Sequence, residues 1–247
     1  MIKSFHLHDA IVKTMKRSSV RASSTYLIKK GGSEVLEMYT AAMSQSKDWP
    51  GLFVSSTHFQ HAKLTVAVVL GCTPQHMAKI EKLLREAPEV KSHPLLMVGL
   101  FAELHRDRVE AIVNEAVRDC DIASAKLGMF DDTPKPHVRR SLLLSRELRN
   151  CRIKTKKAEE EVRSTKSQLG KMMEQMDELA TRGHRVSMGG HAADMMDDKF
   201  ATSIARFKRR FEEIKMELDA LMAQCRMTFD DMTFSEELVR TNDSLNI

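Results

Sequence analysis

The sequence predicts an α+β protein that is mostly helical: a small α/β head with few strands, followed by a long antiparallel helical hairpin that forms a coiled-coil stalk. Two observations support this prediction. Residues 137–232 carry two apolar stripes with alternating spacings of three and four residues, separated by glycines at 183, 189 and 190. The candidate strands all precede residue 71, so strands come first and the chain is helical afterwards.

The N-terminal segment, residues 1–33, is basic and rich in serine. We expect a partly ordered arm with one strand around Tyr26–Ile28 and a turn at Gly31-Gly32. Residues 34–43 have an apolar face made by Val35, Leu36, Met38 and Tyr39, which predicts a short helix.

Two strands are predicted next, at Gly51–Ser55 and Leu64–Leu70. The second is β-branched and almost continuously apolar, which is typical of a strand buried on both faces. Gly71 ends it, and Thr73-Pro74 then caps a helix that we expect to reach Ala87.

A long helix is expected from Pro94 to about Lys126, where Gly128 ends it. The order predicts five regions: an arm (1–48), a head (49–130), a linker (131–136), the hairpin (137–232) and a flexible tail (233–247). The two hairpin helices are expected at 137–182 and 192–232.

The hairpin seam is predicted from apolar side chains that recur on one face of each helix. Its principal members are Leu144, Leu148, Val162, Leu169 and Met176 in the first helix, and Phe200, Phe207, Phe211 and Leu218 in the second.

Charge predicts that the two helices pair with each other. Eight Lys and Arg residues lie between Arg139 and Lys157. If the chain turns near residue 188, this basic block lies beside the acidic stretch 219–237, in antiparallel register. We then expect Phe200, Phe207 and Phe211 to pack toward Val162, Leu169 and Met176.

Three side-chain groups are weaker candidates for binding sites. His58, His61, Cys72 and His76 match no recognised zinc spacing, and we expect ordinary histidines there. Asp194, Asp197 and Asp198 suit the N-terminus of a helix, with a low-affinity Mg²⁺ or Ca²⁺ site as the alternative. Lys208-Arg209-Arg210 reads as the solvated back of an amphipathic helix rather than an import signal.

The sequence contains no GxSxG, GxxxxGK[ST] or HExxH motif, so we expect no enzyme and no organic cofactor. Its four cysteines form no CxxC pair and are expected to be reduced. Its longest apolar runs, Leu64–Cys72 and Pro94–Ala102, fall well short of a membrane span, and the first residues lack a signal-peptide core. We therefore expect a cytoplasmic protein.

The segment from Trp49 to Arg108 resembles a known family. Its distinctive elements are Trp49-Pro50, the two strands, the helix capped by Thr73, His93-Pro94-Leu95-Leu96 and Phe101-Ala102-Glu103-Leu104. This order resembles an uncharacterised set of fungal proteins that are similar to the CorA magnesium-transporter superfamily. The resemblance implies an α/β cytosolic head followed by long helices, the last of which leads into a membrane hairpin of a pentameric channel.

The sequence departs from that superfamily in two respects. It has no Gly-Met-Asn pore signature, the nearest string being Gly128-Met129-Phe130, and it has no membrane segment before its last residue, Ile247. We therefore expect a relative of the cytosolic part, acting in assembly or regulation of a metal-ion transporter at the cytosolic face of a membrane. We also expect a homo-oligomer or helical protein partners, and contact with the membrane only through a partner or a missing C-terminal segment.

Two alternatives remain open. One is a soluble coiled-coil scaffold unrelated to ion transport, and the other is a protein that binds nucleic acid through Arg139–Lys157 and the basic N-terminal arm. The charge pairing within the hairpin makes nucleic acid the less favoured partner.

Overall fold

The structure is a computed structural model that describes residues 22–30, 33–42, 51–59, 62, 64–86, 93, 95–128, 138–186 and 194–245. Within these ranges, the side chains of 22–42, 127–128, 138–142, 179–186, 194–201, 240 and 242–245 are left undescribed. The chain divides into two compact units: unit 1 holds residues 1–106 and 165–215, and unit 2 holds residues 107–164 and 216–247.

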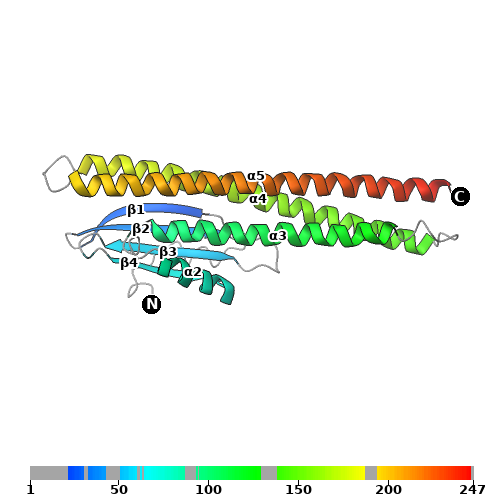
Figure 1. Ribbon diagram of the computed structural model, residues 1–247, viewed down its shortest axis with the longest axis horizontal. Coiled ribbons are helices and arrows are strands. Elements are labelled where there is room, and N and C mark those ends of the chain that lie inside the picture. The colour runs from blue at the N-terminus through cyan, green and yellow to red at the C-terminus, as the bar shows by residue number, and fades with distance from the viewer. Residues whose placement is uncertain are drawn as a thin grey trace. The chain divides into compact units, whose positions relative to one another are not determined.

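Unit 1 contains a four-stranded antiparallel sheet in which each strand pairs with the next one along the chain (Figure 1). This order confirms the small head with few strands. The strands are β1 (Ala22–Lys30), β2 (Ser33–Ala42), β3 (Leu52–Phe59) and β4 (Leu64–Leu70).

Strand β2 replaces the short helix that the sequence predicted at residues 34–43. The apolar doublets at 35–36 and 38–39 fit the helical period, but β2 is paired along its length on both sides. Leu36, for example, lies opposite Leu27 of β1 and His58 of β3. Cross-strand pairing has therefore overridden the local pattern, as is common for strands.

The buried strand is β3 rather than β4. Six successive residues of β3, from Leu52 to Thr57, are buried, so both faces of this strand are covered. The apolar run Leu64–Leu70 is a strand with the predicted bounds, but it lies at the edge of the sheet, and its residues are half-buried or exposed. Its expected burial on both faces is wrong.

A glycine and a cap define the connection from β4 to helix α2 (Pro74–Glu86). Gly71 has a φ of 82°, and a Cβ there would lie 1.9 Å from the carbonyl oxygen of Gly51, so only glycine fits. Thr73 Oγ1 accepts a hydrogen bond from the His76 amide at 3.2 Å, and His76 Nδ1 accepts one from the Thr73 amide at 3.4 Å. The predicted cap is confirmed as a reciprocal pair.

Helix α3 (Leu96–Gly128) begins at the His-Pro-Leu-Leu element. His93 Nδ1 accepts a hydrogen bond from the Leu95 amide at 3.1 Å, and the His93 carbonyl accepts one from the Leu96 amide at 3.2 Å. His93 thus supplies acceptors to amides at the start of the helix. The segment of α3 in unit 1 buries Phe101, Ala102 and Leu104.

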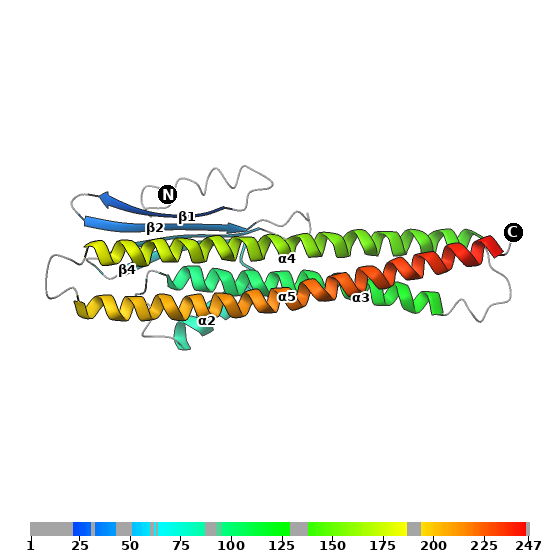
Figure 2. The same cartoon turned by 90° about the horizontal axis from the view of Figure 1, so that it is seen from above.

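Helices α4 (Val138–Val186) and α5 (Asp194–Leu245) run antiparallel, as predicted (Figure 2). Helix α5 extends past residue 232, so residues 233–245 are helical rather than a flexible tail. None of the helices that the structure describes is long and apolar enough to cross a membrane.

Three ion pairs fix the register of this hairpin: Lys208–Asp177 in unit 1, and Arg226–Glu159 and Arg152–Glu236 in unit 2. In each pair, the sequence position halfway between the two residues lies between 192 and 194, several residues beyond the expected turn near 188. The basic block therefore faces a stretch about ten residues farther along α5 than the predicted 219–237.

Candidate interaction surface

The predicted seam is occupied within the protein. Its described members Leu144, Leu148, Val162, Leu169, Met176, Phe211 and Leu218 are all buried, and Phe207 is half-buried. The side chain of Phe200 lies outside the described residues. A seam filled in this way presents no open surface to a partner.

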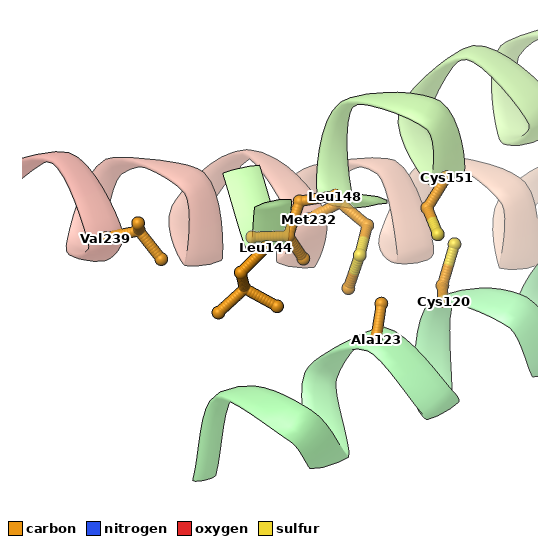
Figure 3. Packing of buried hydrophobic residues seen from close by; sticks show 7 residues of the cluster. All are labelled: Cys120, Ala123, Leu144, Leu148, Cys151, Met232 and Val239. Carbon is orange, nitrogen blue, oxygen red and sulfur yellow. The ribbon is translucent and has the colours of Figure 1, made fainter. Parts of the chain in front are cut away.

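Helix α3 is a third member of the seam, which the sequence analysis missed. In unit 2, Cys120 and Ala123 of α3 form one apolar cluster with side chains from both α4 and α5 (Figure 3). The other members of the cluster are Leu144, Leu148, Cys151, Met232 and Val239. The hairpin is therefore part of a three-helix core in this unit rather than a self-contained pair.

Phe207 also packs against α3, in unit 1. Its ring lies 5.3 Å from the ring of His93, centroid to centroid. A Cβ placed on Gly99 would lie 2.6 Å from Phe207 Cε1. The prediction named contacts of Phe207 with α4, and the structure adds one with α3, where Gly99 leaves room for the ring.

The thiols of unit 2 are protonated and shielded. Burial raises the pKa of Cys151 and of Cys225 to about 11, and it also raises the pKa of Cys120. Cys120 Sγ lies 3.4 Å from Thr155 Oγ1. All four cysteines are free, as predicted, and those of unit 2 serve as small core groups.

The Lys208-Arg209-Arg210 cluster, a candidate predicted from charge, is paired within the chain. Each residue of the Lys208-Arg209-Arg210 cluster pairs with an acid, respectively Asp177, Glu213 and Glu103. Within the described residues, no group of three or more His, Cys, Asp or Glu is placed to hold a metal ion.

The histidines and aspartates that were considered as ligands are placed as follows. His58 Nδ1 lies 3.0 Å from Thr65 Oγ1, and His76 caps α2. His61 lies outside the described residues. Asp194, Asp197 and Asp198 lie at the start of α5, and their side chains are outside the described part, so the Mg²⁺ hypothesis for them stays a prediction.

The surface that stands out lies on α5 in unit 2. Met216, Met227 and Phe234 each expose more than 60% of their surface, and Leu238 exposes 42%. Ala220 and Ala223, also exposed, lie between the first two. The spacings of 11, 7 and 4 residues place the four large side chains on one side of the helix, opposite the buried seam. We call this set the α5 apolar stripe.

Acidic side chains border the α5 apolar stripe. Asp230 and Asp231 lie between Met227 and Phe234, and Glu237 follows one turn later. All three are exposed, and the described part of the chain shows no ion pair for any of them. The stripe is therefore an apolar surface with negative edges.

The outward face of α4 in unit 2 has the opposite charge. Ile153 is 46% exposed, and basic residues lie three or four positions to either side of it. These are Arg149, Lys156 and Lys157, with Arg146 one turn further toward the N-terminus; all are exposed and, among the residues described, none forms an ion pair. We call Ile153 and these four residues the α4 basic face.

The remaining basic residues of this stretch are used within unit 2. Lys154 Nζ donates a hydrogen bond to the Asp119 carboxylate of α3. Arg152 binds Glu236 of α5 at 2.5 Å, and its guanidinium carbon lies 5.0 Å from the centroid of the Phe229 ring. The predicted basic-to-acidic pairing is thus carried by Arg152, while the α4 basic face points away from both partner helices.

Neither protein-family models nor curated proteins match this chain. Among solved structures, the fold is similar to the crystal structure of the ZntB cytoplasmic domain from Vibrio parahaemolyticus RIMD 2210633. The TM-score is 0.43 and the sequence identity is 9%, and the likeness covers 96% of this chain and 82% of that chain.

Proposed function

We propose that the chain is a non-enzymatic assembly module that acts at the cytosolic face of a membrane, in a metal-ion transport system of the CorA-like kind. It has no membrane-crossing role of its own in this proposal and works by binding other helices. The observation that carries the assembly role is the α5 apolar stripe. A monomeric protein rarely leaves several large apolar side chains in a row on one helix face unless a partner covers them.

The link to metal-ion transport rests on the resemblance of residues 49–108. The sheet-then-long-helices order found here is the order that the resemblance implies for a cytosolic head and stalk. His93 and Leu95 belong to the most distinctive element of the resemblance. The His93 ring accepts a hydrogen bond from the Leu95 amide at the start of α3.

The alternative is a soluble scaffold that binds a helix of an unrelated protein. The same stripe favours it, since an apolar row at spacings of four and seven residues is the pattern that helix-in-groove recognition reads. The two functions differ in what the partner does, not in the surface used.

A photo-crosslinking residue in place of Phe234 tests the assembly role. In its native host, the full chain is expected to crosslink strongly at this position and weakly at Arg118, an exposed residue of α3 that serves as the control. The masses of the products identify the partner. No product above the Arg118 background would contradict an assembly role for the stripe.

Metal content separates the transport system from the scaffold. Cells carrying Phe234→Glu in place of the wild-type chain should differ from wild type in total Mg²⁺ or Zn²⁺, measured by mass spectrometry of digested cells. An unchanged metal content together with a strong crosslink would favour the scaffold.

A further inference from the structure

We propose that the α5 apolar stripe of one copy docks on the α4 basic face of a second copy of this chain. The inference rests on the proposed assembly role and goes further, because it names the occupant of the stripe and the residues that select it. Both surfaces belong to unit 2, so every copy carries the two halves of the contact.

Charge complementarity is the first argument. The stripe offers the exposed carboxylates of Asp230, Asp231 and Glu237, and the α4 basic face offers four exposed cations. Within the described residues, neither set has ion-pair partners in its own chain. Opposite potentials on two surfaces raise the rate of encounter and fix which surfaces meet.

The placement of the apolar groups is the second argument. Met227 and Phe234 are seven residues apart, which is about 10.5 Å along a helix, with the two aspartates between them. Ile153 stands alone at the middle of its basic surroundings. A single branched side chain can enter the space between two large ones, in the manner of a knob in a coiled coil.

Such docking brings the charges together as well as the apolar groups. Arg149 and Lys157 flank Ile153 by four residues on either side, and Lys156 by three. Asp230 and Asp231 lie three or four residues from both Met227 and Phe234, and Glu237 lies three residues beyond Phe234. Seating Ile153 between these two residues therefore sets basic side chains against acidic ones over about two helical turns.

The contact joins two different surfaces, which limits the assemblies it can make. In a dimer with two-fold symmetry this contact forms twice, and in a closed ring it forms once between each two neighbouring copies. A like-with-like contact of two stripes would instead bring acidic edges together, and two basic faces would repel in the same way. The charge pattern thus favours the mixed contact over either symmetric one.

A charge-swap experiment on the full chain tests this proposal. One variant reverses the basic face (Lys156→Glu with Lys157→Glu), another reverses the stripe edge (Asp230→Lys with Asp231→Lys), and a third combines all four changes. Arg118→Glu, an exposed change on α3, is the control. Sedimentation velocity at low salt measures the assembled mass against the 28.1 kDa of one chain.

We expect the wild type and Arg118→Glu to associate, and each two-residue variant to associate at least about tenfold more weakly. The combined variant should recover association, and so should an equimolar mixture of the two reversed variants, since each then meets its complement. Circular dichroism should show unchanged helix content in all of them, because the altered side chains are exposed.

Two outcomes would overturn the inference. One is a wild-type mass of a single chain at every concentration; the other is a combined variant and a mixture that stay as dissociated as the separate variants. The first of these, together with a strong Phe234 crosslink to another protein, rejects the second copy as occupant and leaves the assembly role standing. A Phe234 position that gives no crosslink above the Arg118 background rejects both the second copy as occupant and the assembly role.

Discussion

The Arg210 guanidinium of α5 binds the Glu103 carboxylate of α3 in unit 1 through two hydrogen bonds. Nε donates to Oε1 at 2.5 Å and Nη2 to Oε2 at 3.1 Å. Burial alone would raise the pKa of Glu103, but the bond and charge of Arg210, helped by Lys79 and Arg106, bring the pKa below its ordinary value of 4.5. This two-pronged contact ties residues that are 107 positions apart in the sequence.

Replacing Glu103 with Gln should lower the free energy of unfolding by about 1–2 kcal/mol at neutral pH, because a charged pair becomes a weaker neutral one. Urea unfolding followed by circular dichroism measures it. Because the folded pKa is depressed, the contribution of Glu103 is present above the unfolded pKa and is lost as the pH falls through the folded value. The difference between wild type and Glu103→Gln should therefore shrink below pH 4.5; a constant difference would contradict the assignment.

The contact of Gly99 with Phe207 predicts a substitution with an unusual sign. Alanine normally favours a helix over glycine by about 1 kcal/mol. At position 99, however, its methyl group must displace the Phe207 ring, so Gly99→Ala should destabilise the protein by about 1–2 kcal/mol.

Gly170 of α4 is the matched control, since a Cβ there meets nothing within 4 Å. Gly170→Ala should stabilise by about 0.5–1 kcal/mol in the same urea experiment. In a Phe207→Leu background the cost of Gly99→Ala should fall, because the smaller side chain can yield. Equal effects of the two glycine substitutions would show that Phe207 does not press on α3.

A structural feature can be predicted from the sequence when the residues that determine it lie close together in the chain. The bounds of β4 and the Thr73 cap are local: the β-branched run and the Thr-Pro pair lie within a few residues of what they determine. Strand β2 is not set by its local pattern alone, because its doublets fit the helical period, and of its two partners only β1 directly precedes it, while β3 pairs with residues 10 to 24 positions away. The seam residues were found because their spacing is regular.

The surface on α5 escaped the sequence analysis for a related reason. Its members lie on the face opposite a strong stripe, and Asp230 and Asp231 interrupt them. The signal was present as the spacing of Met227, Phe234 and Leu238, but a second, weaker row on a helix is apparent only once the first is known to be buried. The register error has the same origin, since blocks of charge specify direction but not which residues pair, as Arg152 and Glu236 do.

His93 makes the stability of the folded chain fall as the solution becomes mildly acidic. Burial, together with the neighbouring His58, lowers the pKa of His93 to about 4. Between this value and the ordinary 6.5 the unfolded chain takes up a proton that the folded chain refuses, so stability falls as the pH falls through this range, by at most about 1.4 kcal/mol per pH unit for this group.

His93→Asn tests this dependence, because its side-chain oxygen can still accept the Leu95 amide hydrogen. Urea midpoints measured between pH 7 and pH 4 should decline less steeply for the variant than for the wild type. Some slope should persist, since burial also lowers the pKa of His58. Identical slopes would mean that His93 titrates alike in the folded and unfolded chains.

The buried ion pair of unit 2 predicts that two changes are better tolerated than one. Arg108 Nη2 of α3 donates to Glu161 Oε2 of α4 at 3.3 Å, and the side chains are only 3% and 6% exposed. Glu161→Met removes the carboxylate that Arg108 binds in the core and should cost about 3–5 kcal/mol. Arg108→Met combined with Glu161→Met removes both charges and keeps an apolar side chain of similar reach at each site, so it should cost clearly less. Urea unfolding of the three proteins decides the matter: if the double variant is as unstable as Glu161→Met, the pair contributes through packing rather than through the cost of an uncompensated charge.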